Sequence, residues 1–338
     1  WARGAAPQEG NVAKVRHLLT SYEKAGLFSA PMADPACRAG TQESRAVALN
    51  AALGAPVLLK NEEQALPLSP SSRICIGGTN AYTVAQGGGS SMVQLETAPL
   101  TFAELMQKEG AFLLPGRWFK HSHLKQRVRN SNAVVLVVGF DHIEESEAYD
   151  RPWALNAVDL KAIKTAVRLN KRTIVVVQSG SAVEMESWQD GVAAILYTSF
   201  LGSSTAQALK ALLFGQVSPS GKLPFTQARY LHEYRAMRSY PKNFDTVTIN
   251  RIKKGQGDPK VREVQKLCYT EALMTGYRQF DTEGPEPLYC FGHGLSYGSF
   301  SYDLAGVKEL EEGRWDLAVT ITNTGRCPAA EVVQLYVH

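Results

Sequence analysis

Four carboxylates and one guanidinium stand close together in a short stretch, Glu144, Glu145, Glu147, Asp150 and Arg151. A pair of carboxyl groups can do acid/base and nucleophilic work, because one group can hold a proton while the other stays charged. The commoner interpretation of such a cluster is a solvated surface loop. Asp150-Arg151 is equally open to two interpretations, a structural ion pair or a ligand contact. The elements that position this loop therefore decide its chemistry.

Other polar motifs are less specific. The glycine-rich stretch Gly87–Ser91 could cradle a phosphate through backbone N–H groups, but it lacks the GxGxxG and GxxxxGK[ST] patterns of nucleotide sites. A doubly wound nucleotide-binding domain would need such a fingerprint. Lys60 begins a Lys-Asn-Glu stretch that is either a polar turn or part of a site. The histidines, including His121 and His123, lack HExxH spacing, and the serines and cysteines lack a recognisable partner for nucleophilic catalysis. The sequence predicts no metal and no cofactor.

Composition fits a folded, globular chain. The 338 residues are 44% hydrophobic and 20% charged, which predicts one large domain and a smaller one. A net charge of +4 is too small to indicate nucleic acid or another acidic polymer. No apolar run reaches 18 residues, the N-terminus shows no signal-peptide pattern, and the five cysteines include no CxxC pair. The cysteines do not decide the compartment.

Between about residues 54 and 226, short apolar runs alternate with amphipathic stretches. This order predicts a three-layer α/β/α sandwich with a mostly parallel sheet. Ligands of such sheets bind at the carboxyl ends of the strands, so the loops after Ile76, Val138 and Val177 are the first candidates. The expected strands are 55–59, 74–76, 133–138, 174–177 and 192–196, and the expected helices are 12–24, 43–53, 159–169 and 206–213.

The remaining parts of the chain follow different patterns. Residues 227–266 mix Pro, Gly and basic residues, which predicts a long loop excursion. Alternation over 317–321 and again over 331–337 predicts strands, the opening of an incomplete β-sandwich. The expected organisation is 1–53 as a linker and terminal helix, 54–300 as the α/β/α sandwich domain, and 301–338 as the partial sandwich.

Ordered motifs make this chain resemble the carboxy-terminal half of glycoside hydrolase family 3, the β-glucosidase and β-xylosidase family. The resemblance covers nearly the whole chain. It rests on VLLKNE at 57–62, LPL at 66–68, GGGSS at 87–91, ESEAYDR at 145–151, LFG at 213–215, VSPSGKLP at 217–224, YTE at 269–271, GYR at 276–278, FGHGLSY at 291–297, NTG at 323–325 and EVVQLYV at 331–337.

The resemblance implies the second-domain portion of a retaining, exo-acting β-glycosidase, with β-glucosidase favoured over β-xylosidase. It implies that this chain supplies the acid/base glutamate, Glu145 or Glu147, with Glu145 favoured. It also implies one wall of the sugar pocket, and a fibronectin type III-like start to the final sandwich. The substrate contacts implied are Lys60, Ser90, Ser91, Asp150 and Arg151. His293, between two glycines, is expected to be structural.

The family's nucleophile is an Asp on an upstream (β/α)8 barrel, and no Ser-Asp-Trp or Ser-Asp-Tyr motif occurs here. Retaining glycosidases need two carboxyl groups about 5 to 5.5 Å apart. We therefore expect this chain alone to lack the nucleophile and to need the barrel, with a β-linked oligosaccharide or glycoside as substrate. The alternative is a non-catalytic module that binds carbohydrate or stabilises a barrel. The resemblance also implies a secreted or periplasmic enzyme.

Overall fold

The computed structural model describes residues 8–29, 40–93, 98–147, 150–240 and 268–336. The chain divides into two compact units, residues 1–46 and 47–338. In the first unit, α1 (Gln8–Lys24) confirms the helix predicted at 12–24. Its apolar side chains at Val12, Val15 and Leu18 are each about half exposed. In the described residues, no helix is both long and apolar enough to cross a membrane.

The second unit is built on a six-stranded sheet in the order β1-β6-β5-β4-β2-β3. The five strands from β2 to β6 run parallel, which confirms the predicted mostly parallel sheet, and β1 pairs antiparallel with β6. The strands are β1 (Val57–Asn61), β2 (Ile74–Gly77), β3 (Phe112–Leu113), β4 (Ala133–Gly139), β5 (Thr173–Gln178) and β6 (Ala194–Tyr197).

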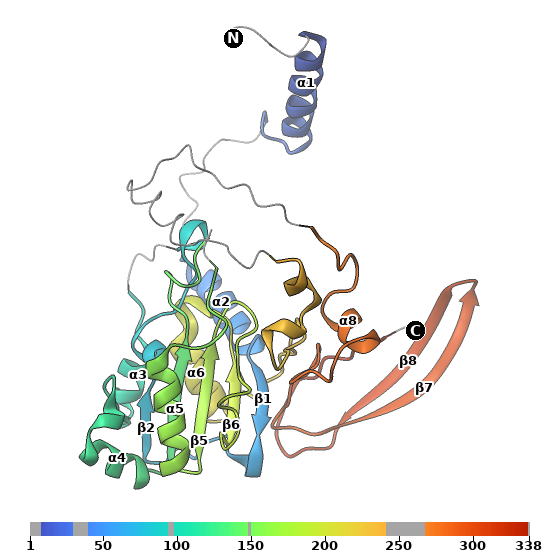
Figure 1. Cartoon of the computed structure of the whole chain (residues 1–338). Coiled ribbons are helices and arrows are strands. Elements are labelled where there is room, and N and C mark those ends of the chain that lie inside the picture. The colour runs from blue at the N-terminus through green and yellow to red at the C-terminus, as the bar shows by residue number, and fades with distance from the viewer. Residues whose placement is uncertain (1–7, 30–39, 94–97, 148–149, 241–267, 337–338) are drawn as a thin grey trace. The chain divides into compact units, whose positions relative to one another are not determined.

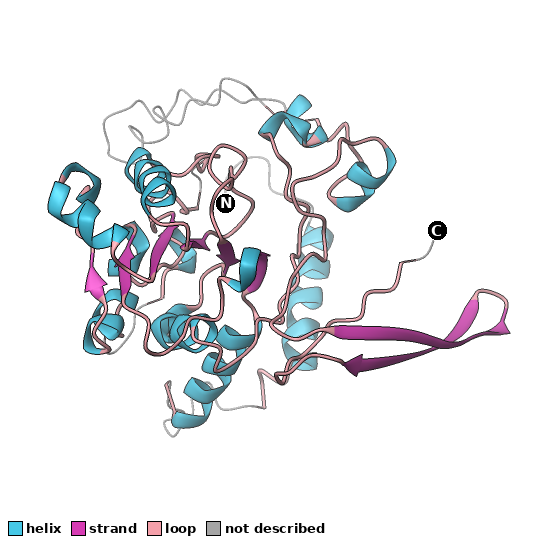
Figure 2. Ribbon diagram, turned by 90° about the horizontal axis from the view of Figure 1, so that it is seen from below, coloured by secondary structure: helices cyan, strands magenta, loops and turns pink. Residues whose placement is uncertain are grey.

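Helices cover both faces of this sheet (Figures 1 and 2). Successive strand side chains point to opposite faces, so β4 sends Val135 and Val137 into one core and Leu136 and Val138 into the other. The first core is completed by α2 (Gln42–Gly54), α3 (Phe102–Lys108) and α6 (Thr205–Leu213). The second is completed by α4 (Ser122–Arg129) and α5 (Ala157–Leu169). The predicted three-layer sandwich is therefore confirmed.

Among the described residues, three helices were not predicted from the sequence: α3, α4 and α8 (Tyr277–Thr282). The start of α3 carried a readable signal, because Thr101 and Glu104 form a capping box in which each side chain bonds the other's backbone. Short 3₁₀ turns connect the elements at Glu62–Gln64, Thr79–Tyr82, Gly89–Ser91, Trp118–Lys120, Gly202–Ser204, Leu231–Glu233 and Arg235–Arg238. Most of the predicted excursion at 227–266, from 241 onward, lies outside the described residues.

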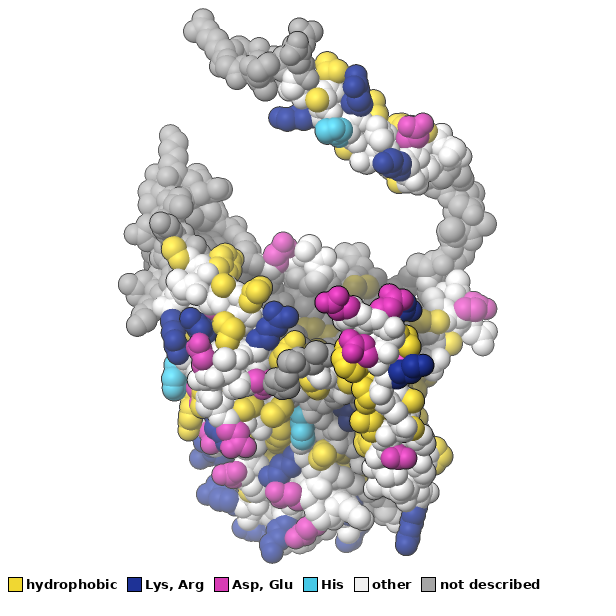
Figure 3. Space-filling view, turned by 90° about the vertical axis from the view of Figure 1, so that its right-hand side faces the viewer, with side chains coloured by type: hydrophobic (Ala, Val, Ile, Leu, Met, Phe, Trp, Pro, Cys, Tyr) yellow, Lys and Arg dark blue, Asp and Glu magenta, His cyan; other side chains and the backbone are white. Residues whose placement is uncertain are grey.

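A two-stranded antiparallel hairpin, β7 (Phe300–Glu311) and β8 (Arg314–Asn323), follows the sandwich. Apolar side chains such as Leu304 and Trp315 are more than half exposed, and Figure 3 views the side of the molecule that carries this hairpin. The prediction of a strand at 331–337 is wrong for its described part, because residues 331–336 form no strand. Their alternating apolar groups, Leu335 among them, stay exposed because no facing sheet covers them.

Candidate active site

Three loops meet at the carboxyl end of the sheet, as the strand order requires. They follow the neighbouring strands β2, β4 and β5, and they are the loops that the sequence predicted. The Gly88 N–H donates to the Glu145 carbonyl oxygen at 2.8 Å, and the Gly180 N–H donates to Glu145 Oε1 at 2.9 Å. The acidic loop after β4 is thus held between the glycine-rich loop after β2 and the turn after β5.

Two glycines make this close approach possible. A Cβ added at Gly88 would lie 1.8 Å from the carbonyl oxygen of His142, and one at Gly180 would lie 2.6 Å from Glu145 Oε2. Real side chains do not tolerate such distances to backbone or to a fixed carboxylate. The glycine-rich loop is therefore required for backbone packing against the acidic loop, in addition to any role toward a ligand.

Glu145 is turned inward and its carboxylate is occupied. Oε1 accepts hydrogen bonds from Ser179 Oγ at 3.0 Å and from the Gly180 N–H, and lies 3.2 Å from Arg151 Nε. Only 14% of the Glu145 side chain is exposed. Such a carboxylate fastens the acidic loop to the turn that follows β5.

Arg151 completes the same anchor. Its guanidinium packs 4.4 Å above the ring of Phe140, and Nη2 donates to Ser181 Oγ at 2.8 Å. Burial lowers the pKa of Arg151, and the neighbouring Glu145 carboxylate works against that shift. Removing either partner would leave the other charge poorly solvated, so the pair is a structural element of the loop.

Asp150 is separated from this ion pair. The Tyr240 hydroxyl donates to Asp150 Oδ1 at 2.6 Å, and this bond is the main cause that raises the pKa of Tyr240 to about 12. Of the two interpretations offered for Asp150-Arg151, the ion pair is present for the arginine, but its partner is Glu145 and not Asp150.

Glu147 stands on the outer side of the loop and is exposed. Its Oε2 lies 3.3 Å from the backbone nitrogen of Ser90, which donates to it, and 3.2 Å from the position that a Cβ on Gly89 would take. The Ser91 hydroxyl instead donates to the Gly88 carbonyl oxygen at 2.8 Å and shapes the glycine-rich turn. The structure therefore brings Glu147 and Ser90 together at the accessible side of the three loops.

Lys60 is not brought to this site. It lies on the antiparallel strand β1, where it pairs with Ile195 near the start of β6, so it stands at the amino end of the parallel strands. Its Nζ bonds the Gln189 carbonyl oxygen at 3.2 Å and Glu62 Oε1 at 3.0 Å. The sequence did not reveal this separation, because strand direction is a tertiary property.

Some residues of the site were not predicted. Ser179, Gly180 and Tyr240 hold the predicted carboxylates, and Ser179-Gly180 could have been found because they directly follow a predicted strand. Tyr240 carried no such signal, being 90 positions from its partner Asp150. His293 is structural, as expected, with Nε2 at 2.9 Å from the Leu59 carbonyl oxygen. In the part of the chain that the structure describes, no His, Cys, Asp and Glu side chains gather as a metal site.

Comparisons with known proteins identify the family to which this sandwich domain belongs. Residues 56–297 match the model of the glycosyl hydrolase family 3 C-terminal domain. The chain belongs to glycosyl hydrolase family 3.

Relatives and solved structures agree with this assignment. The chain is 30% identical over 312 residues to an exo-α-(1→6)-L-arabinopyranosidase of Bifidobacterium longum, covering 86% of this chain and 38% of that protein. It is 31% identical over 308 residues to thermostable β-glucosidase B of Acetivibrio thermocellus, and this match also covers 86% of this chain and 38% of that protein. The crystal structure of a Bifidobacterium adolescentis β-glucosidase superposes with a TM-score of 0.75 at 26% identity, covering 88% of this chain and 43% of that one. The chain thus spans about two fifths of the length of these proteins.

Proposed function

We propose that this chain supplies the general acid/base glutamate and one wall of the sugar pocket of a retaining, exo-acting β-glycosidase. The single observation that carries the proposal is the division of labour in the acidic loop. Glu145 and Arg151 anchor the loop, while Glu147 is presented at the exposed side beside Ser90. An exposed carboxylate on an anchored loop suits proton transfer to a bound substrate.

Glu147, rather than Glu145, is the acid/base in this proposal. The acid must give its proton to the leaving oxygen and later take one from water. Glu145 accepts hydrogen bonds from Ser179 and Gly180 and pairs with Arg151, and these three interactions fasten the loop. Protonating Glu145 would weaken these bonds at every turnover. Glu147 can change its charge without releasing the anchor.

The second carboxylate of the reaction comes, in this proposal, from a barrel domain outside this chain. The match to a C-terminal domain model and the 38% coverage of the relatives support this part. The barrel's carboxylate would attack the anomeric carbon, and Glu147 would protonate the leaving oxygen from the other side. Ser90 and Ser91 then form part of the wall near the sugar.

A β-glucoside is the substrate that we favour. The Acetivibrio relative and the Bifidobacterium adolescentis structure are both β-glucosidases. The arabinopyranosidase relative makes an L-arabinopyranoside the competing choice. Pyranosides of glucose and arabinose differ in ring substituents, so a matched panel of aryl glycosides separates them.

The test begins with the purified 338-residue chain and aryl β-glucosides, β-xylosides and α-L-arabinopyranosides. We expect no aglycone release from the chain alone, and release, fastest from the glucoside, from the enzyme that joins this chain to its barrel. Turnover by the chain alone that disappears in Glu145→Ala or Glu147→Ala would contradict the proposal, because both carboxylates would then lie within this sequence.

A further inference from the structure

The amino end of the parallel strands carries a cavity of about 890 Å³, at the end of the sheet opposite to the acidic loop. Its walls come from the residues at the start of β2, from the start of β3 and from one side of α4. A volume of this size is typical of sites for small molecules and short oligomers. It stands apart from the proposed catalytic loop and plays no part in the mechanism above.

The formally charged side chains that line this cavity are both arginines, Arg73 and Arg127. His123 also contributes to its walls, and none of its described lining residues is Asp or Glu. Across the described residues, these three side chains take part in none of the ion pairs. The sequence also holds no carboxylate between Glu109 and Asp141. A net charge of only +4 therefore conceals a local excess of positive charge.

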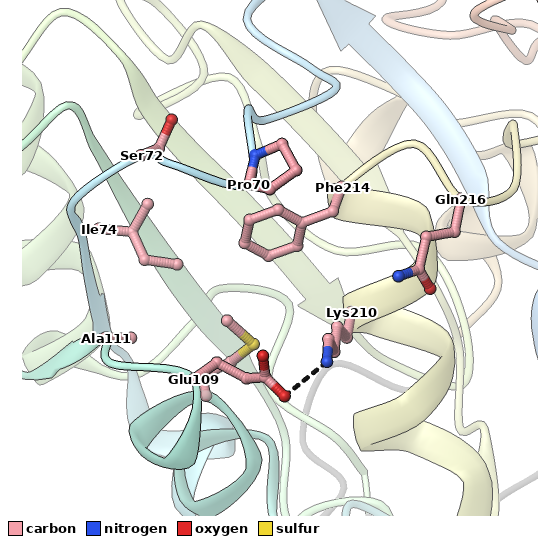
Figure 4. Close-up of a pocket in the computed structure, with 9 residues that line it drawn as sticks. Pro70, Ser72, Ile74, Glu109, Ala111, Lys210, Phe214 and Gln216 are labelled. Carbon is pink, nitrogen blue, oxygen red and sulfur yellow. Dashed lines mark hydrogen bonds and ion pairs between the residues drawn. The ribbon is translucent and has the colours of Figure 1, made fainter.

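In an adjoining pocket, a lysine forms an ion pair with a carboxylate. This pocket shares Ile74 and Ala111 with the larger cavity and has a volume of about 230 Å³. In it, Lys210 Nζ lies 2.6 Å from Glu109 Oε1, and the dashed line in Figure 4 joins the two side chains. The larger cavity has no such carboxylate on its wall, so its positive charge is available to a ligand.

The geometry goes beyond ordinary helix capping. Arg127 lies in the last turn of α4, where basic residues commonly offset the helix dipole. Arg73, however, comes from the approach to β2, so cations from two separate segments line the same cavity. The Arg127 guanidinium lies 4.5 Å above the ring of Phe112, which restricts its position. Gln126 lies on the same wall, where its amide donates to Asn130 Oδ1 at 3.1 Å and accepts from Arg129 Nη1 at 3.4 Å.

We propose that this cavity binds a carboxylate-bearing sugar, such as a uronate-containing oligosaccharide, at a site separate from the catalytic loop. Arginine forks pair with carboxylates through two parallel hydrogen bonds, and amide side chains bond sugar hydroxyls. A glycan is favoured over nucleic acid because only two arginines line the pocket, whereas a nucleic-acid site needs an extended basic face.

The test measures binding to the full 338-residue chain by fluorescence anisotropy. The ligands are a labelled β-1,4-linked oligoglucuronate and the cello-oligosaccharide of equal length, which differ only in carboxylate against hydroxymethyl groups. We expect the uronate to bind at least about tenfold more tightly than the neutral chain and to weaken as salt is added. Equal affinity for the two would overturn the proposal.

Two double variants locate the binding. Arg73→Gln with Arg127→Gln should weaken uronate binding about tenfold or more. The control, Lys125→Gln with Arg129→Gln, also removes two positive charges, but from α4 residues that do not line the cavity. It should change the affinity for the uronate less than about threefold. Thermal unfolding of both variants checks their folding, and Arg127→Lys, which keeps the charge and loses the fork, gives a milder second probe. Equal losses in both double variants, or an oligonucleotide that binds as tightly as the uronate, would contradict a sugar site in the cavity.

Discussion

The inner and outer parts of the acidic loop differ in what their carboxylates contact. On the inner part, Glu145 is 14% exposed and is held by an arginine, a hydroxyl and a backbone N–H. On the outer part, Glu147 is exposed and faces a glycine-rich turn. The difference teaches that a carboxylate in a site motif can serve the fold while its near neighbour serves the reaction. Substitutions at the two positions should therefore affect different measurements.

The largest effect is expected from Glu147→Gln in the enzyme that includes the barrel. Loss of a general acid/base group should lower kcat/KM on glycosides about 10²- to 10⁴-fold, with little change in the free energy of unfolding. Steady-state kinetics and denaturant unfolding check both parts. Glu144→Gln in the same loop is the matched control and should retain most activity. A fully active Glu147→Gln enzyme would remove Glu147 from the mechanism.

Glu145→Gln should chiefly reduce stability. The amide cannot pair with the largely buried guanidinium of Arg151, and we expect the free energy of unfolding to fall by about 2 kcal/mol. The control is Glu186→Gln, which breaks a more exposed pair with Arg229 and should cost less than about 1 kcal/mol. Urea denaturation of the 338-residue chain measures both. Equal losses would show that the Glu145 anchor contributes no more than a surface ion pair.

Gly88→Ala tests the contact between the glycine-rich loop and the acidic loop. The added methyl group would lie 1.8 Å from the His142 carbonyl oxygen, so the glycine-rich loop must move away from Glu147. We expect about a tenfold loss of kcat/KM, because small displacements at a reacting group are costly. Gly116→Ala, which meets no atom within 4 Å, should be silent. An unchanged Gly88→Ala enzyme would indicate that the contact between the loops is dispensable.

The smallest effect is expected in the pH dependence of stability, through the tyrosine that bonds the backbone of Ser179. The Tyr197 hydroxyl donates to the Ser179 carbonyl oxygen, and burial raises the pKa of Tyr197 to about 12. Because the folded pKa exceeds the ordinary value of about 10, this stabilising contribution is present below pH 10 and is lost as the pH rises toward 12.

Denaturant unfolding from pH 9 to pH 12 should therefore show a steeper loss of stability for the native chain than for Tyr197→Phe. Tyr82 and Tyr289, whose pKa values burial also raises to about 12, leave a residual slope in the variant. Identical slopes would indicate that Tyr197 does not ionise on unfolding. The anchor of Glu145 would then be insensitive to the state of this tyrosine.

Local patterns predicted the scaffold well and the contacts poorly. The apolar runs at 133–138 and 174–177 are strands β4 and β5, and their order correctly pointed to the loops that follow them. The strand β3 has two residues, and the basic helix α4 has eight residues of which only Leu124 and Val128 are buried and apolar, so neither was predicted. The strand expected at 331–337 depended on a facing sheet, which alternation alone cannot supply.

Within the candidate site, the sequence identified the acidic loop but could not assign its members. Glu145 was favoured, whereas its bonds to Ser179 and Arg151 support an anchoring role that only the folded loops bring together. Lys60 was grouped with the site because the direction of β1 cannot be read from its residues. Motifs therefore locate a site along the chain, and strand direction and packing decide which side chains reach it.

The most direct test of the central claim compares leaving groups in the enzyme that includes the barrel. An acid is needed to expel a poor leaving group such as a sugar and hardly needed for dinitrophenolate. For Glu147→Gln, we predict that the fold-loss in the rate of glycosyl-enzyme formation is at least about 10² times larger for cellobiose than for a dinitrophenyl glucoside. For Glu145→Gln, we predict the same fold-loss for both substrates. The reverse pattern, a leaving-group dependence in Glu145→Gln and none in Glu147→Gln, would contradict the assignment.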